Sequence, residues 1–416
     1  MVLSLSCFLR STQFLVAFLV IIDLTMLPCT KKYLTAFLMD APFHNHPSLV
    51  LVAGGSGGHM FPAIAVAEAS FKSSLERAVI LITDGRGARF LTESSRSLFH
   101  AIHVLPSSAF LHYRTVLTLI QCMRILRHLP CKPCFVIGFG GKMSVLPLIA
   151  ARLLRIPSAL HQSDCIMGKA NARLSYGVNV LFLGFRETLG VPTQALSKVV
   201  YLGTPVRSAF HAVAPLSLPD SFHAEQPLQV LVLGGSQGAR FWCDALPKAL
   251  LRLSKDQQRS IHLIHQCRED EMDVCQKAYK ATESVVELVP FIVDMPSALG
   301  WAHCVLSRAG ASSMAELMST GRPAFFVPYP FATRDHQNAN ASKVIQAMGL
   351  HPSAWIGAQD EVIPEKIARF LRQCLHNPSM LRYAGEIMRT QSHPHAASQL
   401  ASFCWDQRHG IQRKDS

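Results

Sequence analysis

The chain has 416 residues, of which 49 % are hydrophobic and 16 % are charged, and its formal net charge is +13. This composition excludes a fibrous, low-complexity or largely disordered protein, and the length suits two domains with a substantial core. The positive charge indicates an anionic partner, which could be a phosphate-bearing substrate, an anionic membrane surface or nucleic acid.

The first 47 residues form a hydrophobic N-terminal extension. An apolar run at positions 14–22 is interrupted by Asp23 and is shorter than a transmembrane span. The extension could be a signal-like segment or an amphipathic anchor. We favour a non-essential extension, because the first predicted strand begins only near Ser48.

A glycine-rich turn follows a predicted strand in each half of the chain. The first turn, at 54–59, follows the apolar run 49–53, and the second, at 234–240, follows the apolar run 230–233. Continuous hydrophobicity is typical of buried parallel strands. Glycines at a helix start let the backbone approach an anion such as phosphate. One turn alone could be an ordinary connection, but the pair indicates two nucleotide-binding domains. Neither turn has the dinucleotide-binding or P-loop pattern.

Strands and helices alternate from residue 48 onward. In the first half we predict a helix at 62–75 and further strands at 78–83, 135–137 and 157–161. After a Pro-, Ser- and His-rich stretch at 212–227, strands are predicted at 229–233, 260–265, 285–288, 304–306 and 324–327. This order predicts an α/β protein with two Rossmann-like, doubly wound parallel-sheet domains that face a cleft. We place these domains at 48–210 and 211–390, and expect a C-terminal helix in 391–416 to pack back on the first.

The segment between Glu93 and Asp164 contains basic residues and no acidic ones. Within it, Phe110, Leu111 and Arg114 begin a basic amphipathic stretch. That stretch could lie on anionic lipid, or it could be a core helix with a solvated basic edge. Nucleic acid is disfavoured as a partner, because no recognised binding motif accompanies the charge.

The twelve cysteines are scattered, and Cys243 and Cys304 fall inside predicted elements, so we expect free thiols in a reducing compartment. Cys131 and Cys134 form a C-x-x-C pair, but it precedes a strand and has no second pair nearby, which argues against redox or zinc chemistry. No Asp-x-Asp pair ends a predicted strand, so we expect neither a catalytic metal nor a cofactor.

Several motifs, taken together and in order, resemble those of the MurG-type glycosyltransferases. The resemblance runs from about residue 48 to about 349 and covers the segments 54–62, 138–141, 161–164, 203–207, 234–240, 291–295, 307–316 and 335–340. It implies the GT-B fold. It also implies an inverting transfer of N-acetylglucosamine from UDP-N-acetylglucosamine to the 4-hydroxyl of undecaprenyl-diphospho-N-acetylmuramoyl-pentapeptide. That reaction converts lipid I to lipid II in peptidoglycan synthesis.

The resemblance also implies roles for individual residues. His59 would be the general base for the acceptor hydroxyl, and the loops at 56–58 and 140–141 would lie on the acceptor side. Glu316 would hold the ribose hydroxyls, the Ile292 backbone would read uracil, and Gln337 and Asn340 would contact the donor sugar. The residues implied for UDP-N-acetylglucosamine are Ser56, Gly57, Gly58, Asp164, Arg207, Ser236, Ile292, Ala311, Ser312, Ser313, Met314, Ala315, Glu316 and Gln337. Those implied for the acceptor and membrane are Phe110, Leu111, Arg114, Gly140 and Gly141.

Two positions depart from the family pattern: Gln162 stands where glutamate is usual, and Lys142 where an aromatic residue is frequent. The resemblance implies a peripheral enzyme on the cytoplasmic face of the inner membrane, with an anionic membrane surface as a partner. Two alternatives stay open: another GT-B enzyme, such as a nucleotide-sugar epimerase or a glycolipid synthase, and a catalytically silent membrane-bound scaffold.

Overall fold

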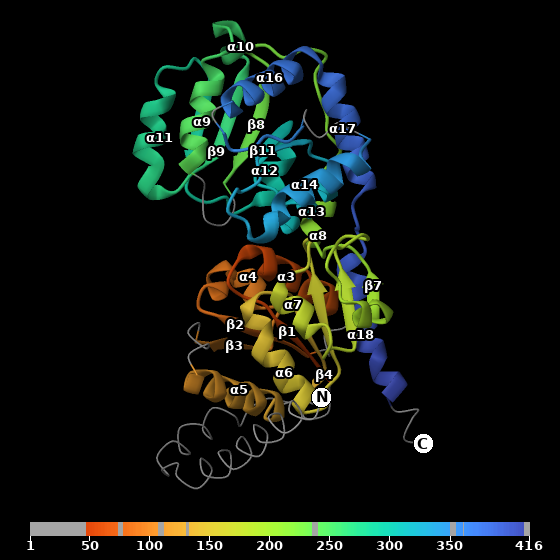
Figure 1. Cartoon of the computed structure of the whole chain (residues 1–416). Coiled ribbons are helices and arrows are strands. Elements are labelled where there is room, and N and C mark those ends of the chain that lie inside the picture. Colours follow the sequence, from red (N-terminus) through yellow and green to blue (C-terminus); the bar gives the residue numbers. More distant parts are fainter. Residues whose placement is uncertain are drawn as a thin grey trace, which may run out of the picture. The chain divides into compact units, whose positions relative to one another are not determined.

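The structure is a computed structural model (Figure 1). It describes residues 47–73, 78–106, 112–129, 133–234, 240–349, 355–360 and 362–411. Residues 1–46 and the predicted site residues Phe110, Leu111 and Ser236 lie outside these ranges.

The first sheet contains seven parallel strands in the described residues. Their order across the sheet is β3-β2-β1-β4-β5-β6-β7. The strands are β1 (Ser48–Val52), β2 (Ala78–Asp84), β3 (Ala101–Leu105), β4 (Pro133–Gly138), β5 (Ser158–Gln162), β6 (Val180–Leu183) and β7 (Val199–Tyr201). The helices of this half are α3 (Gly57–Ser73), α4 (Glu93–Arg96), α5 (His112–Arg127), α6 (Val145–Leu153), α7 (Lys169–Leu174) and α8 (Ser208–His211).

The second sheet contains five parallel strands in the described residues. Their order is β10-β9-β8-β11-β12. The strands are β8 (Leu228–Leu233), β9 (Ile261–Gln266), β10 (Val285–Val289), β11 (Cys304–Ser307) and β12 (Ala324–Phe326). The helices that follow are α9 (Arg240–Leu250), α10 (Lys255–Arg259), α11 (Met272–Tyr279), α12 (Met295–Trp301), α13 (Ala311–Thr320), α14 (His336–Ala347), α16 (Ile363–His376), α17 (Pro378–Thr390) and α18 (Ala396–Ile411).

Both sheets change winding direction at one pair of neighbouring strands. In the first sheet the pair is β1 and β4, and in the second it is β8 and β11. Ligands of doubly wound sheets bind beyond the carboxyl ends of the strands at such switch points. The loops that leave these four strands are therefore the first place to look for a site.

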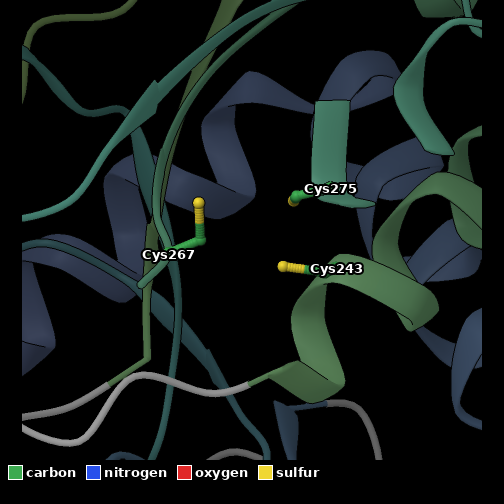
Figure 2. A group of neighbouring side chains, drawn as sticks. All are labelled: Cys243, Cys267 and Cys275. Carbon is green, nitrogen blue, oxygen red and sulfur yellow. The ribbon is translucent and has the colours of Figure 1, made fainter. Parts of the chain in front are cut away.

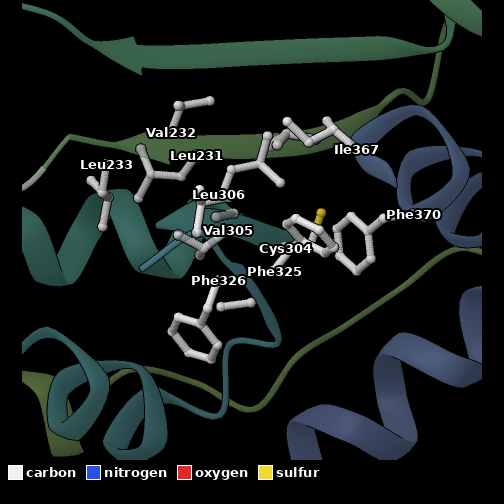
Figure 3. Packing of buried hydrophobic residues seen from close by; sticks show 14 of the residues in the cluster. Leu231, Val232, Leu233, Cys304, Val305, Leu306, Phe325, Phe326, Ile367 and Phe370 are labelled. Atoms are coloured by element: carbon white, nitrogen blue, oxygen red, sulfur yellow. The ribbon is translucent and has the colours of Figure 1, made fainter. Parts of the chain in front are cut away.

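The second sheet is held by a continuous apolar core (Figure 3). Leu231 and Val305 on the two central strands are fully buried, as are Ile367 and Phe370 on α16. The rings of Phe325 and Phe370 lie 5.2 Å apart between centroids. Each such side chain contributes about 1.5–3 kcal/mol when it leaves water, so this core fixes the strand ends that carry the loops.

The C-terminal helix α18 packs against α3 and β4 of the first half. Leu400, Cys404 and Trp405 are buried in the same apolar cluster as the first sheet. The Trp405 indole N–H donates to the Ser70 hydroxyl at 3.4 Å. The chain end therefore stabilises the helix that begins at the first glycine-rich turn.

The predicted architecture of two doubly wound parallel sheets is confirmed, and three details differ. Sequence analysis missed β3, β6 and β7, because β3 and β7 are only partly buried and β6 is four residues long, so none gives a long apolar run. Helix α3 begins at Gly57 rather than near Pro62, which lies inside it. The acidic segment 269–273, for which the sequence predicts a solvated loop, instead forms a 3₁₀ turn at Glu269–Glu271 and the start of α11, where carboxylates interact favourably with the helix dipole.

Candidate functional site

The first glycine-rich loop is held by Asp84 at the end of β2. Its Oδ1 accepts hydrogen bonds from the Gly55 N–H at 3.0 Å and the Gly87 N–H at 2.7 Å. Gly55 has φ +79°, which a residue with a side chain rarely adopts. Sequence analysis missed Asp84; the available signal was an acidic residue closing a buried strand beside β1.

His59 lies in the first turn of α3 with its ring turned back onto this loop. Its Nδ1 lies 3.1 Å from the Gly54 carbonyl oxygen and 3.4 Å from the Ser56 hydroxyl. Because a carbonyl oxygen can only accept, Nδ1 carries the proton in this bond. The other ring nitrogen, Nε2, is then the basic one, as a general base requires.

The loop after β4 lies against the same imidazole ring. Gly140 and Gly141 have φ +93° and +72°. A Cβ atom at Gly141 would lie 2.8 Å from His59 Cε1, and one at Gly140 would lie 3.5 Å from His59 Nε2. The close approach requires glycine at position 141, and the positive φ favours glycine at both positions, so the two loops of the first switch point meet at His59.

Gln162 organises the loop after β5. Its side-chain amide donates to the carbonyls of Asp164 at 3.0 Å and Ile166 at 3.2 Å, and its carbonyl accepts from the Asn171 amide at 2.7 Å. The side chain both donates and accepts, which a glutamate carboxylate cannot do. The departure from the family pattern is thus built into the hydrogen bonding of this loop.

Asn340 joins this loop to the second half of the chain. Its amide N–H groups donate to Asp164 Oδ1 at 2.9 Å and to the Ala309 carbonyl at 3.2 Å, and its carbonyl accepts from the Cys165 N–H at 2.9 Å. The residue is fully buried. These contacts use both amide hydrogens of Asn340, so the side chain positions the loops on either side of it.

Arg207 and Glu316 form an ion pair between the segment before α8 and the middle of α13. Arg207 Nη2 lies 3.5 Å from Glu316 Oε1. The guanidinium also lies over the rings of Phe61, at 4.7 Å, and Phe210, at 4.9 Å. Its Nε is buried and has no hydrogen-bond partner within the described part of the chain. Burial raises the pKa of Glu316 to about 7, although Arg207 opposes that rise.

The start of α13 follows β11 at the second switch point. Gly310 is its N-cap and supplies no side chain to the first backbone N–H groups. Ala311 and Ser312 are buried, and Met314 anchors the helix in the core. The helix start thus presents backbone N–H groups and the positive end of a dipole, which suit a diphosphate.

Two further predicted donor residues lie in loops and at a helix start of the second half. Ile292 is partly buried against the second core, between the exposed side chains of Phe291 and Val293. Gln337 lies in the first turn of α14, and its carbonyl accepts from the Tyr329 N–H at 2.9 Å. The residue that caps α14, Asp335, has φ +55°.

Comparison with known proteins agrees with this arrangement of two sheets and their loops. A model of the glycosyltransferase family 28 N-terminal domain matches residues 49–179, and one of the family 28 C-terminal domain matches residues 229–400. The chain belongs to glycosyltransferase family 28. It is an N-acetylglucosaminyltransferase of the GT-B fold.

One relative of this family 28 chain is the UDP-N-acetylglucosamine–N-acetylmuramyl-(pentapeptide) pyrophosphoryl-undecaprenol N-acetylglucosamine transferase of Methylorubrum extorquens. The two are 36 % identical over 367 residues, which is 86 % of this chain and 96 % of the relative. The crystal structure of Acinetobacter baumannii MurG matches with a TM-score of 0.67 and 25 % identity, over 87 % of this chain and 99 % of that one. A UDP-N-acetylglucosamine 2-epimerase from Neisseria meningitidis shares the fold alone, with a TM-score of 0.60, 14 % identity, and 85 % and 98 % of the two chains covered.

The structure of this family 28 chain also contains a cavity of about 450 Å³. Ala311 and Ala315 of α13 line it, together with Met318, Lys343 and His393, whereas Glu316 and His59 do not. Ala311 and Ala315, both predicted to bind the sugar donor, therefore lie on a different face of α13 from Glu316. His393, which sequence analysis missed, packs against Gly203 and bonds to the Tyr201 hydroxyl at 2.6 Å.

The predicted basic segment of this family 28 chain is a surface helix, α5. Thr118, Cys122 and Leu126 of α5 are buried, whereas Arg114 and Leu117 are exposed. The structure thus has the core-facing side and the solvated basic edge of the second alternative, and docking of this stretch on anionic lipid stays a prediction. Among the described residues, no helix has the length and apolar character needed to cross a membrane.

Proposed function

We propose that this chain transfers N-acetylglucosamine from UDP-N-acetylglucosamine to the 4-hydroxyl of polyprenyl-diphosphate-linked muramoyl-pentapeptide, the step that converts lipid I to lipid II. The observation that carries the proposal is the likeness over most of the chain to a transferase named for this reaction. We assign the acceptor to the first half, residues 48–210, and the donor to the second, residues 211–390.

The proposed reaction is a direct displacement with inversion. The acceptor oxygen forms a bond to the anomeric carbon of N-acetylglucosamine while the bond from that carbon to the UDP oxygen breaks. His59 Nε2 takes the hydroxyl proton, since Nδ1 is occupied by the Gly54 carbonyl. The ring becomes an imidazolium and later returns the proton to solvent. The loops at 56–58 and 140–141 would position the acceptor next to this nitrogen.

On the donor side, Glu316 would accept hydrogen bonds from both ribose hydroxyls, because a carboxylate offers two acceptor oxygens. The leaving diphosphate would be met by the N–H groups of Ala311, Ser312 and Ser313 at the start of α13. Arg207 lies beside Glu316, and its Nε, which has no hydrogen-bond partner among the described residues, can donate to an anionic ligand. Ile292 and Gln337 would contact the uracil and the donor sugar, and Ser236 would complete the diphosphate site.

We also propose that the enzyme binds peripherally to the cytoplasmic face of the inner membrane. Two neighbouring helices of the first half, α5 and α6, expose the apolar side chains of Leu117, Ile149 and Leu153. Exposed arginines accompany them at 114, 124, 127, 152 and 155. Such a surface suits anionic headgroups, and we expect no nucleic acid as a partner.

The release of UDP from UDP-N-acetylglucosamine, with and without a lipid I analogue, tests the proposed function. We expect release that depends on the acceptor, and a loss of about 10²–10⁴ in kcat for His59→Ala with donor binding retained. Glu316→Ala should lose donor binding, whereas Glu386→Ala, an exposed carboxylate on α17, should not. Acceptor-independent release would instead indicate an epimerase or hydrolase, and binding without turnover would indicate a silent scaffold.

A further inference from the structure

Three cysteines from different elements of the second half meet in the interior (Figure 2). Cys243 lies on α9, Cys267 directly follows β9, and Cys275 lies on α11. Their exposed fractions are 4 %, 1 % and 0 %. The three sulfur atoms all lie within 4.8 Å of one another. In Figure 2 the side chains of Cys243 and Cys275 point toward the side on which Cys267 lies.

This spacing is close to that of thiolates around one metal ion. With a Zn–S bond of about 2.3 Å and tetrahedral angles, two ligand sulfurs are about 3.8 Å apart. The sulfurs of this cluster would therefore need to approach one another by about 1 Å or less. Side-chain rotation supplies a movement of this size without a change of the backbone.

The surroundings of the cysteine cluster carry unsatisfied polar groups. Glu271 Oε2 is buried and has no hydrogen-bond partner within the described ranges. Glu271 is the N-cap of α11, one helical turn before Cys275. A buried carboxylate oxygen without a partner is costly unless a donor or a cation compensates it. A bound cation would remove this conflict, and Glu271 has the right chemistry for a fourth ligand.

Side chains around the cysteine cluster also hold one of its sulfur atoms in place. The His265 ring is fully buried, and its Nδ1 lies 3.6 Å from Cys275 Sγ and 2.9 Å from the Tyr279 hydroxyl. Its Nε2 is buried and has no hydrogen-bond partner among the described residues. Groups that hold a ligating sulfur in place are typical of metal sites. Thiols that merely fill a core need no such network.

We propose that Cys243, Cys267 and Cys275 bind one thiophilic divalent cation of the Zn²⁺ type, which fastens α9 and α11 to the end of β9. Binding releases three thiol protons, and each sulfur keeps its electron pair, so no oxidant or reductant is needed. The site differs from the C-x-x-C pair at 131–134, and its sequence spacing fits no common zinc motif. A metal site at these three positions is therefore not predictable from the sequence spacing. This proposal is independent of the transfer reaction.

Titration of the full-length, reduced, metal-free protein with Co²⁺ tests this site. We expect one cobalt ion per chain, with intense thiolate-to-cobalt charge-transfer absorption that Zn²⁺ abolishes by displacement. Cys267→Ser should weaken cobalt binding by more than about 100-fold. This loss exceeds the effect of removing a residue that only holds a ligand in place. The matched control is Cys374→Ser, which changes another fully buried thiol of the same half and should bind as the wild type does.

A measurement on the wild-type chain covers the case in which Cys267→Ser fails to fold. Alkylation in mild denaturant, followed by peptide mass mapping, should show that Zn²⁺ protects positions 243, 267 and 275 selectively. Three outcomes would overturn the proposal: no cobalt bound by the wild type, equal loss of binding in Cys374→Ser, or protection confined to Cys131 and Cys134.

Discussion

The guanidinium of Arg207 lies 3.5 Å from the carboxylate of Glu316, and it connects α13 of the second half with Phe61 on α3 of the first. Phe61 in turn contacts the first glycine-rich loop, since a Cβ atom at Gly57 would lie 2.8 Å from its ring. Glu316, the proposed donor carboxylate, is thus connected through Arg207 to Phe61, which lies on α3 close to His59, the proposed base. If the donor ribose binds Glu316, Arg207 loses part of its ion pair, and Arg207 packs on Phe61 next to the acceptor loop.

Donor affinity should depend on the ionisation of Glu316. Burial raises the pKa of this carboxyl to about 7, so the protonated form stabilises the free protein at low pH. This contribution to the free energy of unfolding is fully present below the ordinary pKa of a glutamic acid and is lost as the pH rises through about 7. In our proposal the donor needs the carboxylate, so affinity should rise by up to about tenfold per unit between about pH 6 and about pH 7, and level off above.

Calorimetric titration with UDP-N-acetylglucosamine measures this dependence, since that molecule has no terminal phosphate group that titrates in the same range. Glu316→Gln should bind weakly at every pH and should show a flat profile. A wild-type profile that is also flat, or the same slope in Glu316→Gln, would show that another group controls the pH dependence.

Gly141→Ala should lower turnover more than donor binding. The substitution places a Cβ atom 2.8 Å from His59 Cε1 at a φ of +72°, which costs about 1–2 kcal/mol and displaces the ring. A displacement of about 1 Å at a reacting group reduces the rate by up to about 100-fold. Steady-state kinetics with saturating acceptor should therefore show a lower kcat and an unchanged donor KM.

Gly168→Ala is the control for this variant. Gly168 has φ −66° and open space where a Cβ atom would lie, so the substitution should leave the rate unchanged. If Gly141→Ala were as active as Gly168→Ala, the close packing of the second loop on His59 would have no role in catalysis.

Gln162→Glu should destabilise the chain, although glutamate is the usual residue of the resembled family. The change removes both donations to the carbonyls of Asp164 and Ile166 and buries a carboxylate. A buried acceptor that loses its donor costs about 1–3 kcal/mol. Thermal unfolding should show a lower Tm at neutral pH, with partial recovery in acid as the carboxyl protonates. An unchanged Tm would mean that the loop rearranges around the charge.

Membrane binding should depend on the apolar side chains exposed by α5 and α6. The double substitution Leu117→Ser and Leu153→Ser should reduce flotation with anionic vesicles at least severalfold, because apolar burial and basic charge act together. Leu251→Ser changes an equally exposed leucine of the second half and should float as the wild type does. Equal flotation of both variants would show that Leu117 and Leu153 are not part of the docking surface.

The sequence predicted much of the fold because the central strands are continuous apolar runs, as in 49–53 and 230–233. The family resemblance also selected His59 and Glu316 as candidate site residues, and their roles stay predictions. The sequence could not predict Asp84, Gln162 or Asn340 as organisers of the loops, because each acts through hydrogen bonds to segments that only the folded sheet brings near. The cysteine cluster was hidden for the same reason: its members come from three elements that are separate in the sequence.

The central claim is that the donor binds at the start of α13 with its ribose on Glu316. A crystal structure of the chain with UDP-N-acetylglucosamine tests it most directly. We predict that both ribose hydroxyls lie within hydrogen-bond distance of Glu316, with the diphosphate at the N–H groups of residues 311–313. A donor molecule found instead in the cavity beside Met318, Lys343 and His393, with Glu316 paired only to Arg207, would contradict the claim.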